Sequence, residues 1–423
     1  MSGLAGTVTN VSVTVATGGI ADELGASLDL VAAAVLSLNF SMAIVMPLAG
    51  LYAGRIGLRG MLVVSSLVLA ASSVLLSVFD GVPALFVGRL GQGAALAGLT
   101  PTAVQAAGGL LRDAERGRAL GWWSVANGAG LAVGPLVGGR LFDVGGWAAV
   151  PVPTVGIGLI SMVVAAALPR GLRQSESVAA SAVVMFSLSG GLVVTILSAL
   201  STSAWPLAAG ATALLGVVLA AATARRQRGA EALVPAAWTR DPRVMLSTLG
   251  GAMQMFANGL VQVAVPAWLL FEVSGSIMFS GLALMAMTVT MTLMAPFVGR
   301  RVGAGYPLWF LRGCIGCGAG LLALAIAVGP GPWALSLPAL IVVGVGAGCL
   351  LTPSFHEFSG TVAGREGVGL ALYNMGRLVA FAAGGLFGAV TLAAGWGHAS
   401  FLVTGLAFAG AAFRFRRRPS LRQ

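Results

Sequence analysis

The stretch that decides the fold is GWWSVANGAGLAVGPLVGG, residues 121–139. It is apolar enough to cross a bilayer, yet Gly130, Gly134 and Gly138 recur four residues apart along it. Residues at this spacing share one face of a helix, so a second helix can pack very closely against the stripe. Pro135 removes one backbone hydrogen bond and favours a bend, which a membrane tolerates where neighbours cover the freed carbonyl. The stretch predicts a spanning helix that packs closely and bends, and not a catalytic constellation.

The composition of the whole chain is that of a membrane protein. Of its 423 residues 57% are hydrophobic and only 9% are charged, whereas soluble domains carry about 25% charged residues. The basic residues are all arginine and the net charge is +11, but these arginines lie in short loops between apolar runs and at the C-terminus. That distribution argues against nucleic-acid binding and predicts an all-α integral membrane protein.

The apolar runs define about fourteen candidate spans. They cover residues 3–20, 30–53, 60–79, 82–110, 119–142, 148–168, 178–199, 204–223, 244–271, 277–299, 307–328, 334–354, 367–393 and 399–415. The first run is polar and has no basic residue before it, so this helix is either short or begins upstream of Met1. No cleavable signal peptide is evident, because the N-terminus lacks a positively charged segment.

Charge alternates between successive loops. The loops after even-numbered spans and the C-terminus hold Arg55, Arg59, Arg112, Arg116, Arg118, Arg170, Arg173, Arg225, Arg226, Arg228, Arg240, Arg243, Arg300, Arg301, Arg365, Arg414, Arg416, Arg417, Arg418 and Arg422. The alternate loops hold Asp22, Glu23, Asp29, Asp80, Asp143 and Glu272, with Arg140 as the basic exception. Basic loops stay in the cytoplasm, so we expect a multi-pass plasma-membrane protein with a cytoplasmic C-terminus.

The chain repeats itself at an offset of about 250 residues. Thr100-Pro101 is matched by Thr352-Pro353, Asn10 by Asn258, and Gly54-Arg55 by Gly299-Arg300. This pattern predicts two six-helix bundles, residues 1–170 and 244–423. Two central linker helices and a basic loop, residues 171–243, would separate them. Transporters built from such repeats bind substrate at the repeat interface, near the middle of the bilayer.

The chain resembles the major facilitator superfamily, and within it the fourteen-helix drug:proton antiporter branch, over essentially its whole length. The stretch that opens this section matches the antiporter motif of that branch in full, as Gly121, Gly130, Gly134-Pro135 and Gly138-Gly139. The loop after the second span is similar to the family's cytoplasmic loop motif through Gly50, Arg55, Gly57 and Arg59. It departs from that motif at Gly54, where the family usually has Asp, so a lock between the two halves would be weaker or made differently. The resemblance implies that both motifs contribute to gating, and we expect the glycine-lined span to pack against its repeat-related counterpart and to bend.

Arg89, in LFVGRLGQG, resembles the family's intramembrane arginine. A guanidinium within a span is costly and normally faces a bundle interior or a cavity; the alternative is that Arg89 extends to the membrane surface. The resemblance also implies an acidic residue in the first span, but Ala5 and Gly6 stand there. The coupling candidates are therefore Arg89, Glu272, Glu357 and Arg377, although both glutamates are equally compatible with solvated interfacial charges.

Two polar stripes predict a substrate cavity. Gln254, Asn258 and Gln262 share one helix face, and Thr7, Asn10, Thr14 and Thr17 share a face of the repeat-related first span. Facing stripes would line a central cavity; the alternative is that they hydrogen-bond between helices and stabilise the bundle, at about 1 kcal/mol each. We take Asn10, Thr14, Gln254, Asn258 and Gln262 as the cavity candidates.

Several other patterns are discounted. Cys314, Cys317 and Cys349 lie in apolar runs without a completing ligand pair, and the alternating glycines 344, 346 and 348 follow no strand, so both indicate helix packing. The absence of lysine excludes a P-loop, and no catalytic triad is recognisable. We expect no enzyme, cofactor, metal, nucleotide or nucleic acid. A sensor would be expected to carry a soluble domain, and none is evident.

The expected function is proton-coupled efflux of small amphipathic drugs or antibiotics, which implies antibiotic resistance. Few acidic residues lie in the spans, so we expect neutral or anionic substrates. The alternative is a dedicated exporter or importer of one metabolite or lipid on the same fold. The expected partners are a small-molecule substrate, protons and the lipid bilayer, and we expect a monomer.

Overall fold

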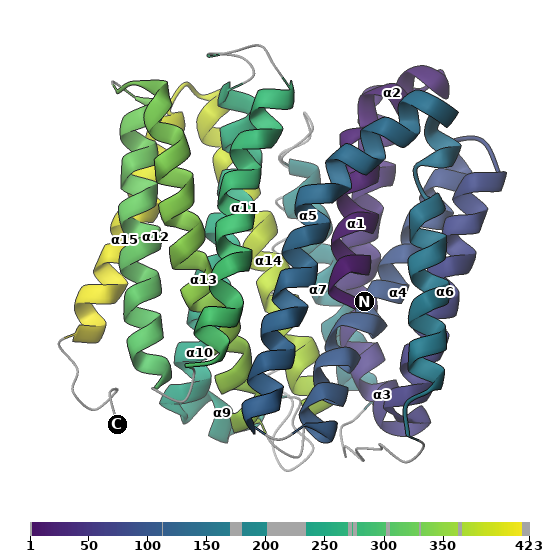
Figure 1. Cartoon of the computed structure of the whole chain (residues 1–423), viewed down its shortest axis with the longest axis horizontal. Coiled ribbons are helices and arrows are strands. Elements are labelled where there is room, and N and C mark those ends of the chain that lie inside the picture. Colours follow the sequence, from purple (N-terminus) through teal and green to yellow (C-terminus); the bar gives the residue numbers. More distant parts are fainter. Residues whose placement is uncertain are drawn as a thin grey trace. The chain divides into compact units, whose positions relative to one another are not determined.

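The computed structural model describes residues 2–111, 113–169, 180–200, 234–269, 273, 277–301, 305–329, 331–362 and 366–416, and their regular structure is helical. The helices are α1 (Ser2–Val15), α2 (Thr17–Glu23), α3 (Leu28–Val78), α4 (Val82–Leu110), α5 (Asp113–Ala149), α6 (Val152–Ala166), α7 (Ala180–Leu200), α9 (Ala236–Arg240), α10 (Pro242–Trp268), α11 (Ile277–Gly299), α12 (Tyr306–Val328), α13 (Ser336–Thr361), α14 (Glu366–Ala393) and α15 (Gly397–Arg416), with a 3₁₀ turn at Trp333–Leu335 (Figure 1).

Helix α3 contains two spans joined by a sharp break. Its 51 residues correspond to about 77 Å of helix, more than twice the ~30 Å of a bilayer's hydrocarbon core. Gly57 leaves helical geometry, with φ 81° and ψ 154°. Only glycine adopts such a conformation without strain, so the chain turns here. The predicted spans 30–53 and 60–79 lie on either side of this turn.

The described residues form a multi-pass membrane protein. They include eight helices long and apolar enough to cross a bilayer, or up to ten if each of two bent helix pairs is one span. The bends are 52° between α1 and α2 and 84° between α5 and α6. The predicted total of fourteen spans remains a prediction, and the predicted span 204–223 lies outside the described residues.

The chain divides into two compact units. Unit 1 comprises Met1–Arg112, Ala129–Ala236 and Val362–Leu378, and unit 2 comprises Asp113–Gly128, Ala237–Thr361 and Val379–Gln423. Two long helices contribute to both units: α5 begins in unit 2 and ends in unit 1, and α14 does the reverse. The three-part division at residues 170 and 243 remains a prediction.

Glycines set the close packing in unit 1. A Cβ on Gly93 of α4 would collide with the backbone carbonyl oxygen of Leu38 in α3, so the two helices approach as closely as their backbones allow. Around this contact lies a core of buried leucines, among them Leu38, Leu69, Leu96 and Leu99.

Unit 2 is built around α13. Gly344 and Gly348 of α13 pack against α11. A Cβ added to Gly344 would collide with the Met287 carbonyl oxygen, and one added to Gly348 would lie 2.6 Å from Met294 Cβ. Gly346 packs instead against Cys317 of α12. The alternating glycines therefore serve helix packing, as predicted. The three cysteines are buried and free. Figure 1 shows α11, α12, α13 and α15 running side by side.

Candidate functional site

Arg89 of α4 lies in the interior of unit 1, and its side chain is completely buried. Its Nε donates to the Val35 carbonyl of α3 at 3.3 Å, and Nη1 donates to the Thr9 carbonyl of α1 at 2.8 Å. The guanidinium also donates to Gln92 Oε1 at 3.1 Å and to Asn10 Oδ1 at 3.4 Å. Arg89 therefore does not extend to the membrane surface, and it joins three helices.

Gln92 extends this network within unit 1. Its Nε2 donates to Ser73 Oγ at 2.9 Å, and Ser73 Oγ donates to the Leu69 carbonyl at 2.8 Å, both in the second half of α3. Every acceptor that Arg89 contacts is a neutral carbonyl or amide oxygen, and among the described residues no carboxylate pairs with it. Burial of an unpaired charge is costly, so the multiple hydrogen bonds are needed to hold it. Neither the Thr9 carbonyl nor Ser73 was foreseen from the sequence.

The glycine stripe of α5 packs against α1, within unit 1. A Cβ added to Gly130 would collide with the Thr7 side chain. A Cβ added to Gly138 would lie 2.6 Å from the Ser12 carbonyl oxygen. Gly134 lies opposite Val11, 3.3 Å from its Cβ for an added methyl. The predicted close helix contact is therefore present, and α1 is the partner.

The backbone of α5 leaves helical geometry beyond the stripe. The break lies at Gly145 and Gly146, with φ 64° at Gly146. There the Glu23 carboxylate accepts a hydrogen bond from the Trp147 N–H at 2.9 Å. A bend at Pro135 remains a prediction. Gly139 has no atom within 4 Å of an added Cβ.

The loop motif lies at the break in α3. After Gly50, Arg55 places its exposed guanidinium over the Tyr52 ring, 5.5 Å from the centroid. Arg59 Nη1 donates to the Leu168 carbonyl at 3.2 Å, just beyond the end of α6. A cation at a helix C-terminus satisfies a free carbonyl and interacts favourably with the helix dipole. The motif thus fastens the α3 turn to α6, and its part in gating remains a prediction.

The polar stripe of α10 lies in unit 2. Gln254 is buried, with Nε2 3.9 Å from the Met291 sulfur of α11, and Gln262 Nε2 donates to Asn258 Oδ1 at 3.0 Å. Asn10 lies in unit 1 and contacts Arg89, and the side chain of Thr14 lies outside the described residues. A cavity shared by the two stripes remains a prediction.

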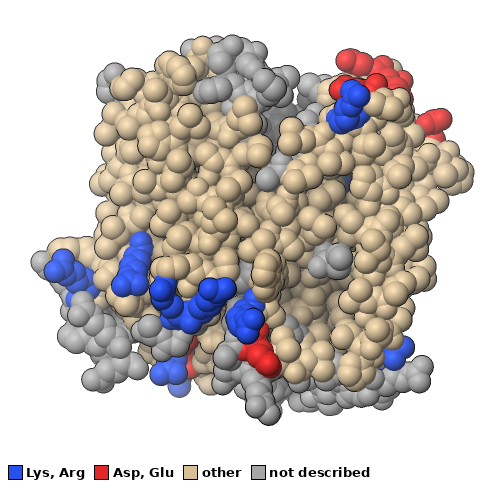
Figure 2. Space-filling model, viewed as in Figure 1, with Lys and Arg blue, Asp and Glu red and all other residues tan. Residues whose placement is uncertain are grey.

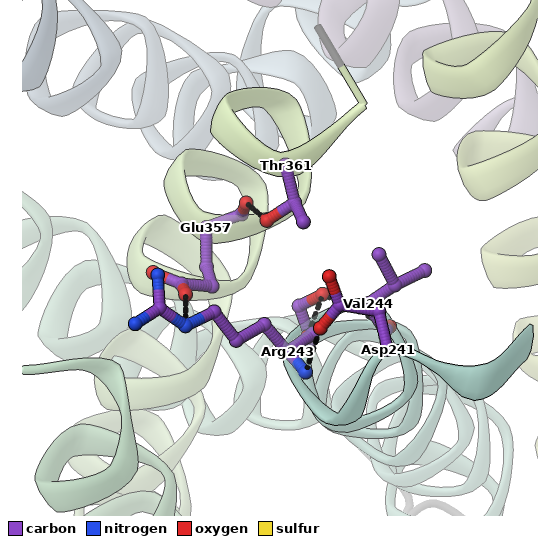
Figure 3. A network of polar contacts seen from close by, with 6 residues as sticks. Asp241, Arg243, Val244, Glu357 and Thr361 are labelled. Carbon is purple, nitrogen blue, oxygen red and sulfur yellow. Dashed lines mark hydrogen bonds and ion pairs between the residues drawn. The ribbon is translucent and has the colours of Figure 1, made fainter. Parts of the chain in front are cut away.

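The charged coupling candidates lie in different places. Glu357 of α13 forms an ion pair with Arg243 of α10, with 3.8 Å between Oε1 and Nε, and Asp241 caps α10 by accepting the Arg243 backbone N–H at 2.8 Å (Figure 3). The Glu357 side chain is 22% exposed and that of Arg243 is 66% exposed. Glu272 lies outside the described residues.

The coupling candidate Arg377 lies in a polar cluster on α14, in unit 1. Arg377 is buried, and its Nη1 donates to Asn374 Oδ1 at 3.2 Å. Its guanidinium lies 5.7 Å from the centroid of the Tyr373 ring. The three residues therefore form one local cluster on α14.

Comparison with known proteins agrees with this architecture. Residues 1–182 match the family model of the Major Facilitator Superfamily. The chain is 30% identical, over 70% of its own length and 56% of the relative's, to the Tetracenomycin C resistance and export protein of Streptomyces glaucescens. It is 31% identical, over 42% of its own length and 34% of the relative's, to the Multidrug export protein EmrB of Haemophilus influenzae. The chain thus spans about half of the first relative and about a third of the second.

Solved structures share the fold. The human organic anion transporter MFSD10 matches with a TM-score of 0.70 at 15% identity over 98% of each chain. The proton:xylose symporter XylE matches with a TM-score of 0.68 at 14% identity over 98% of this chain and 94% of the other.

A helical multi-pass fold with a buried intramembrane arginine and a glycine-lined helix contact defines the class as membrane transporter rather than enzyme. Residues 1–182 match the major facilitator superfamily, and the whole chain has the fold of solved transporters. Members of this family bind small-molecule substrates within the membrane.

Proposed function

We propose that the chain is a secondary active transporter that exports small amphipathic drugs or antibiotics in exchange for protons, by alternating access. The observation that carries the proposal is the packing of Gly130, Gly134 and Gly138 against α1. These glycines belong to a motif that resembles the antiporter motif in full, and their packing shows that its spacing serves a close helix contact. The names of both curated relatives, which include export of tetracenomycin C and of multiple drugs, support the same direction of transport.

The internal charges favour neutral or anionic substrates. Arg89 and Arg377 are buried in unit 1. Within the eight long candidate helices of the described residues, the one carboxylate is Glu357, which lies close to the end of its helix and pairs with Arg243. A buried cation attracts an anionic group and repels a second cation. We therefore propose Arg89 as a fixed charge, and Glu272 or Glu357 as the residue that takes up the proton.

The cavity candidates remain Asn10, Thr14, Gln254, Asn258 and Gln262. The alternative, a dedicated exporter or importer of one metabolite or lipid, uses the same fold, since a fold by itself does not fix the substrate.

The charge distribution supports a plasma-membrane location with a cytoplasmic C-terminus. In unit 1, Arg55 and Arg59 lie at the turn of α3, whereas Asp80 lies one span away, beyond its end. Asp22 and Glu23 belong to α2, and Figure 2 shows acidic side chains at the α2 end of this unit. Arginine-rich ends face the cytoplasm.

Efflux in everted membrane vesicles, with and without collapse of the pH gradient, tests the proposal. We expect gradient-dependent movement of a neutral or anionic dye and little movement of a bis-cationic dye. Glu272→Gln or Glu357→Gln should abolish the gradient dependence, and Arg89→Ala should abolish transport. Arg240→Gln, which removes an exposed arginine of α9 outside both motifs, serves as the control. Unchanged transport in all three variants would refute the coupling assignment.

A further inference from the structure

Three arginines lie on segments that meet near the start of α12 in unit 2. Arg301 follows α11, Arg312 lies in α12, and Arg414 is in the last turn of α15. All three side chains are exposed, and none of them forms an ion pair with a carboxylate among the described residues. Figure 2 shows arginines gathered at one end of this unit.

Trp309 holds two of these arginines near each other. Its indole Nε1 donates to the Arg301 carbonyl at 3.2 Å, and the Arg312 guanidinium lies over its ring, 5.0 Å from the centroid. The Arg301 guanidinium in turn lies 3.9 Å from the centroid of the Phe297 ring. Aromatic contacts of this kind attract a cation and restrict its orientation. The two guanidiniums are therefore positioned by packing although they are exposed.

Phe310, the residue after Trp309, contacts the end of α15. The rings of Phe310 and Phe415 lie 5.5 Å apart, and Phe415 directly follows Arg414. Arg414 therefore lies on the helix that contacts Phe310, whereas Arg301 and Arg312 contact Trp309 directly.

Arg312 lies on an apolar, outward-facing side of α12. Leu308 is one turn before it and Ile315 one turn after it, and these side chains are 41% and 56% exposed. Exposed apolar side chains on a spanning helix contact lipid. Arg312 is six residues from the first residue of α12, or roughly 9 Å along the axis, a depth from which an arginine side chain reaches the headgroup layer.

We propose that Arg301 and Arg312, which both contact Trp309, form a binding site for the phosphate of an anionic phospholipid. The guanidiniums donate to the phosphate oxygens, because their planar forks match this geometry. The acyl chains pack along Leu308 and Ile315. A phospholipid contacts both the guanidiniums and the exposed apolar side chains, whereas a soluble anion contacts only the guanidiniums. This site is separate from the transport residues and does not depend on the proposed direction of transport.

Native mass spectrometry of the full chain in neutral detergent tests the site. Equal amounts of dioleoylphosphatidylglycerol and dioleoylphosphatidylcholine are added, and the bound ratio is measured. We expect the wild type to favour phosphatidylglycerol. Each arginine removed in Arg301→Gln and in the double variant Arg301→Gln/Arg312→Gln should reduce this preference about fivefold, which corresponds to about 1 kcal/mol for each basic residue at an anionic surface.

Two variants make the result specific. Arg55→Gln is the matched control, because Arg55 is also exposed and also lies over an aromatic ring, but in unit 1. It should leave the lipid preference unchanged, and Arg312→Lys, which keeps the charge, should retain most of it. An equal loss in Arg55→Gln would mean diffuse attraction and would overturn the proposal.

Two further arms separate the lipid from other anions. Inorganic phosphate should not displace bound phosphatidylglycerol, and a poly-glutamate peptide should not bind in an arginine-dependent way. Displacement by phosphate would show a soluble-anion site instead, and arginine-dependent peptide binding without lipid preference would show a protein-docking surface. Either result would overturn the lipid assignment.

Discussion

Ser12 Oγ donates a hydrogen bond to the backbone carbonyl oxygen of Gly134, 3.0 Å away. A side chain of α1 thus bonds directly to the backbone of α5, which is reachable because Gly134 has no side chain in between. Serine hydroxyls often join helices in this way inside membranes, where small residues allow backbones to approach. The contact links the glycine stripe to the helix that carries Asn10, which in turn contacts Arg89.

Gly138→Ala should destabilise the chain by about 1–3 kcal/mol, because the added methyl overpacks the contact with the Ser12 backbone. Gly139→Ala is the matched control, since nothing lies within 4 Å of an added Cβ there. Thermal unfolding in detergent and vesicle efflux would both be measured. Equal behaviour of the two variants would show that the stripe does not require close packing.

Arg89→Lys should not replace arginine. An ammonium group on a flexible stem cannot serve the acceptors on α1, α3 and α4 together, and buried acceptors left unpaired cost about 1–3 kcal/mol each. We expect a lower melting temperature in detergent, and a comparable loss for Arg89→Gln. Arg55→Lys, at an exposed position, should melt like the wild type. A wild-type melting temperature for Arg89→Lys would contradict this network.

Gly57→Ala and Gly60→Ala should have opposite effects on stability. Gly57 has φ 81° and ψ 154°, a conformation essentially restricted to glycine, which costs an alanine about 1–3 kcal/mol. Gly60 is helical, with only ordinary contacts from 3.7 Å, so alanine should stabilise the helix by up to about 1 kcal/mol. Chemical or thermal unfolding of the two variants side by side provides the measurement. If Gly60→Ala lowered the stability and Gly57→Ala did not, the turn would not be at Gly57.

The Arg243–Glu357 pair should contribute little to stability. Arg243 is largely exposed, and exposed ion pairs are typically worth 0 to about 1 kcal/mol. A double-mutant cycle with Arg243→Gln and Glu357→Gln should therefore give a coupling energy below about 1 kcal/mol, and it should decrease further at high salt. If Glu357 carries the proton, Glu357→Gln abolishes gradient-dependent efflux while Arg243→Gln retains it. Equal losses in both variants would indicate a structural role.

The apolar runs predicted helix positions well, because length and hydrophobicity decide them. The predicted span 277–299 has the same bounds as α11, whereas α13 continues to Thr361, beyond the predicted end at residue 354. Pro353 lies inside this helix and does not end it. The longer helix carries Glu357 within it, which the apolar run alone did not indicate.

The contacts between helices were less accessible from the sequence. The glycine stripe indicated close packing, which we expected with the repeat-related helix, whereas the contact that the structure describes is with α1. The identity of a partner helix depends on contacts distant in sequence. For the same reason Asn10 was assigned to a cavity, and its contact with Arg89 was not foreseen. Arg312 was overlooked because the charge count considered loops, while this arginine lies within the predicted span 307–328. A search for charges inside spans would have found it.

The hydrogen bonds of Arg89 have one further consequence. Amide and carbonyl oxygens do not gain or lose protons in the physiological range, so the acceptors around this guanidinium stay the same when the surrounding pH changes. The joint between α1, α3 and α4 is thus insulated from the proton gradient. These three helices can remain fastened to one another through every turnover, while protons bind and leave at other residues.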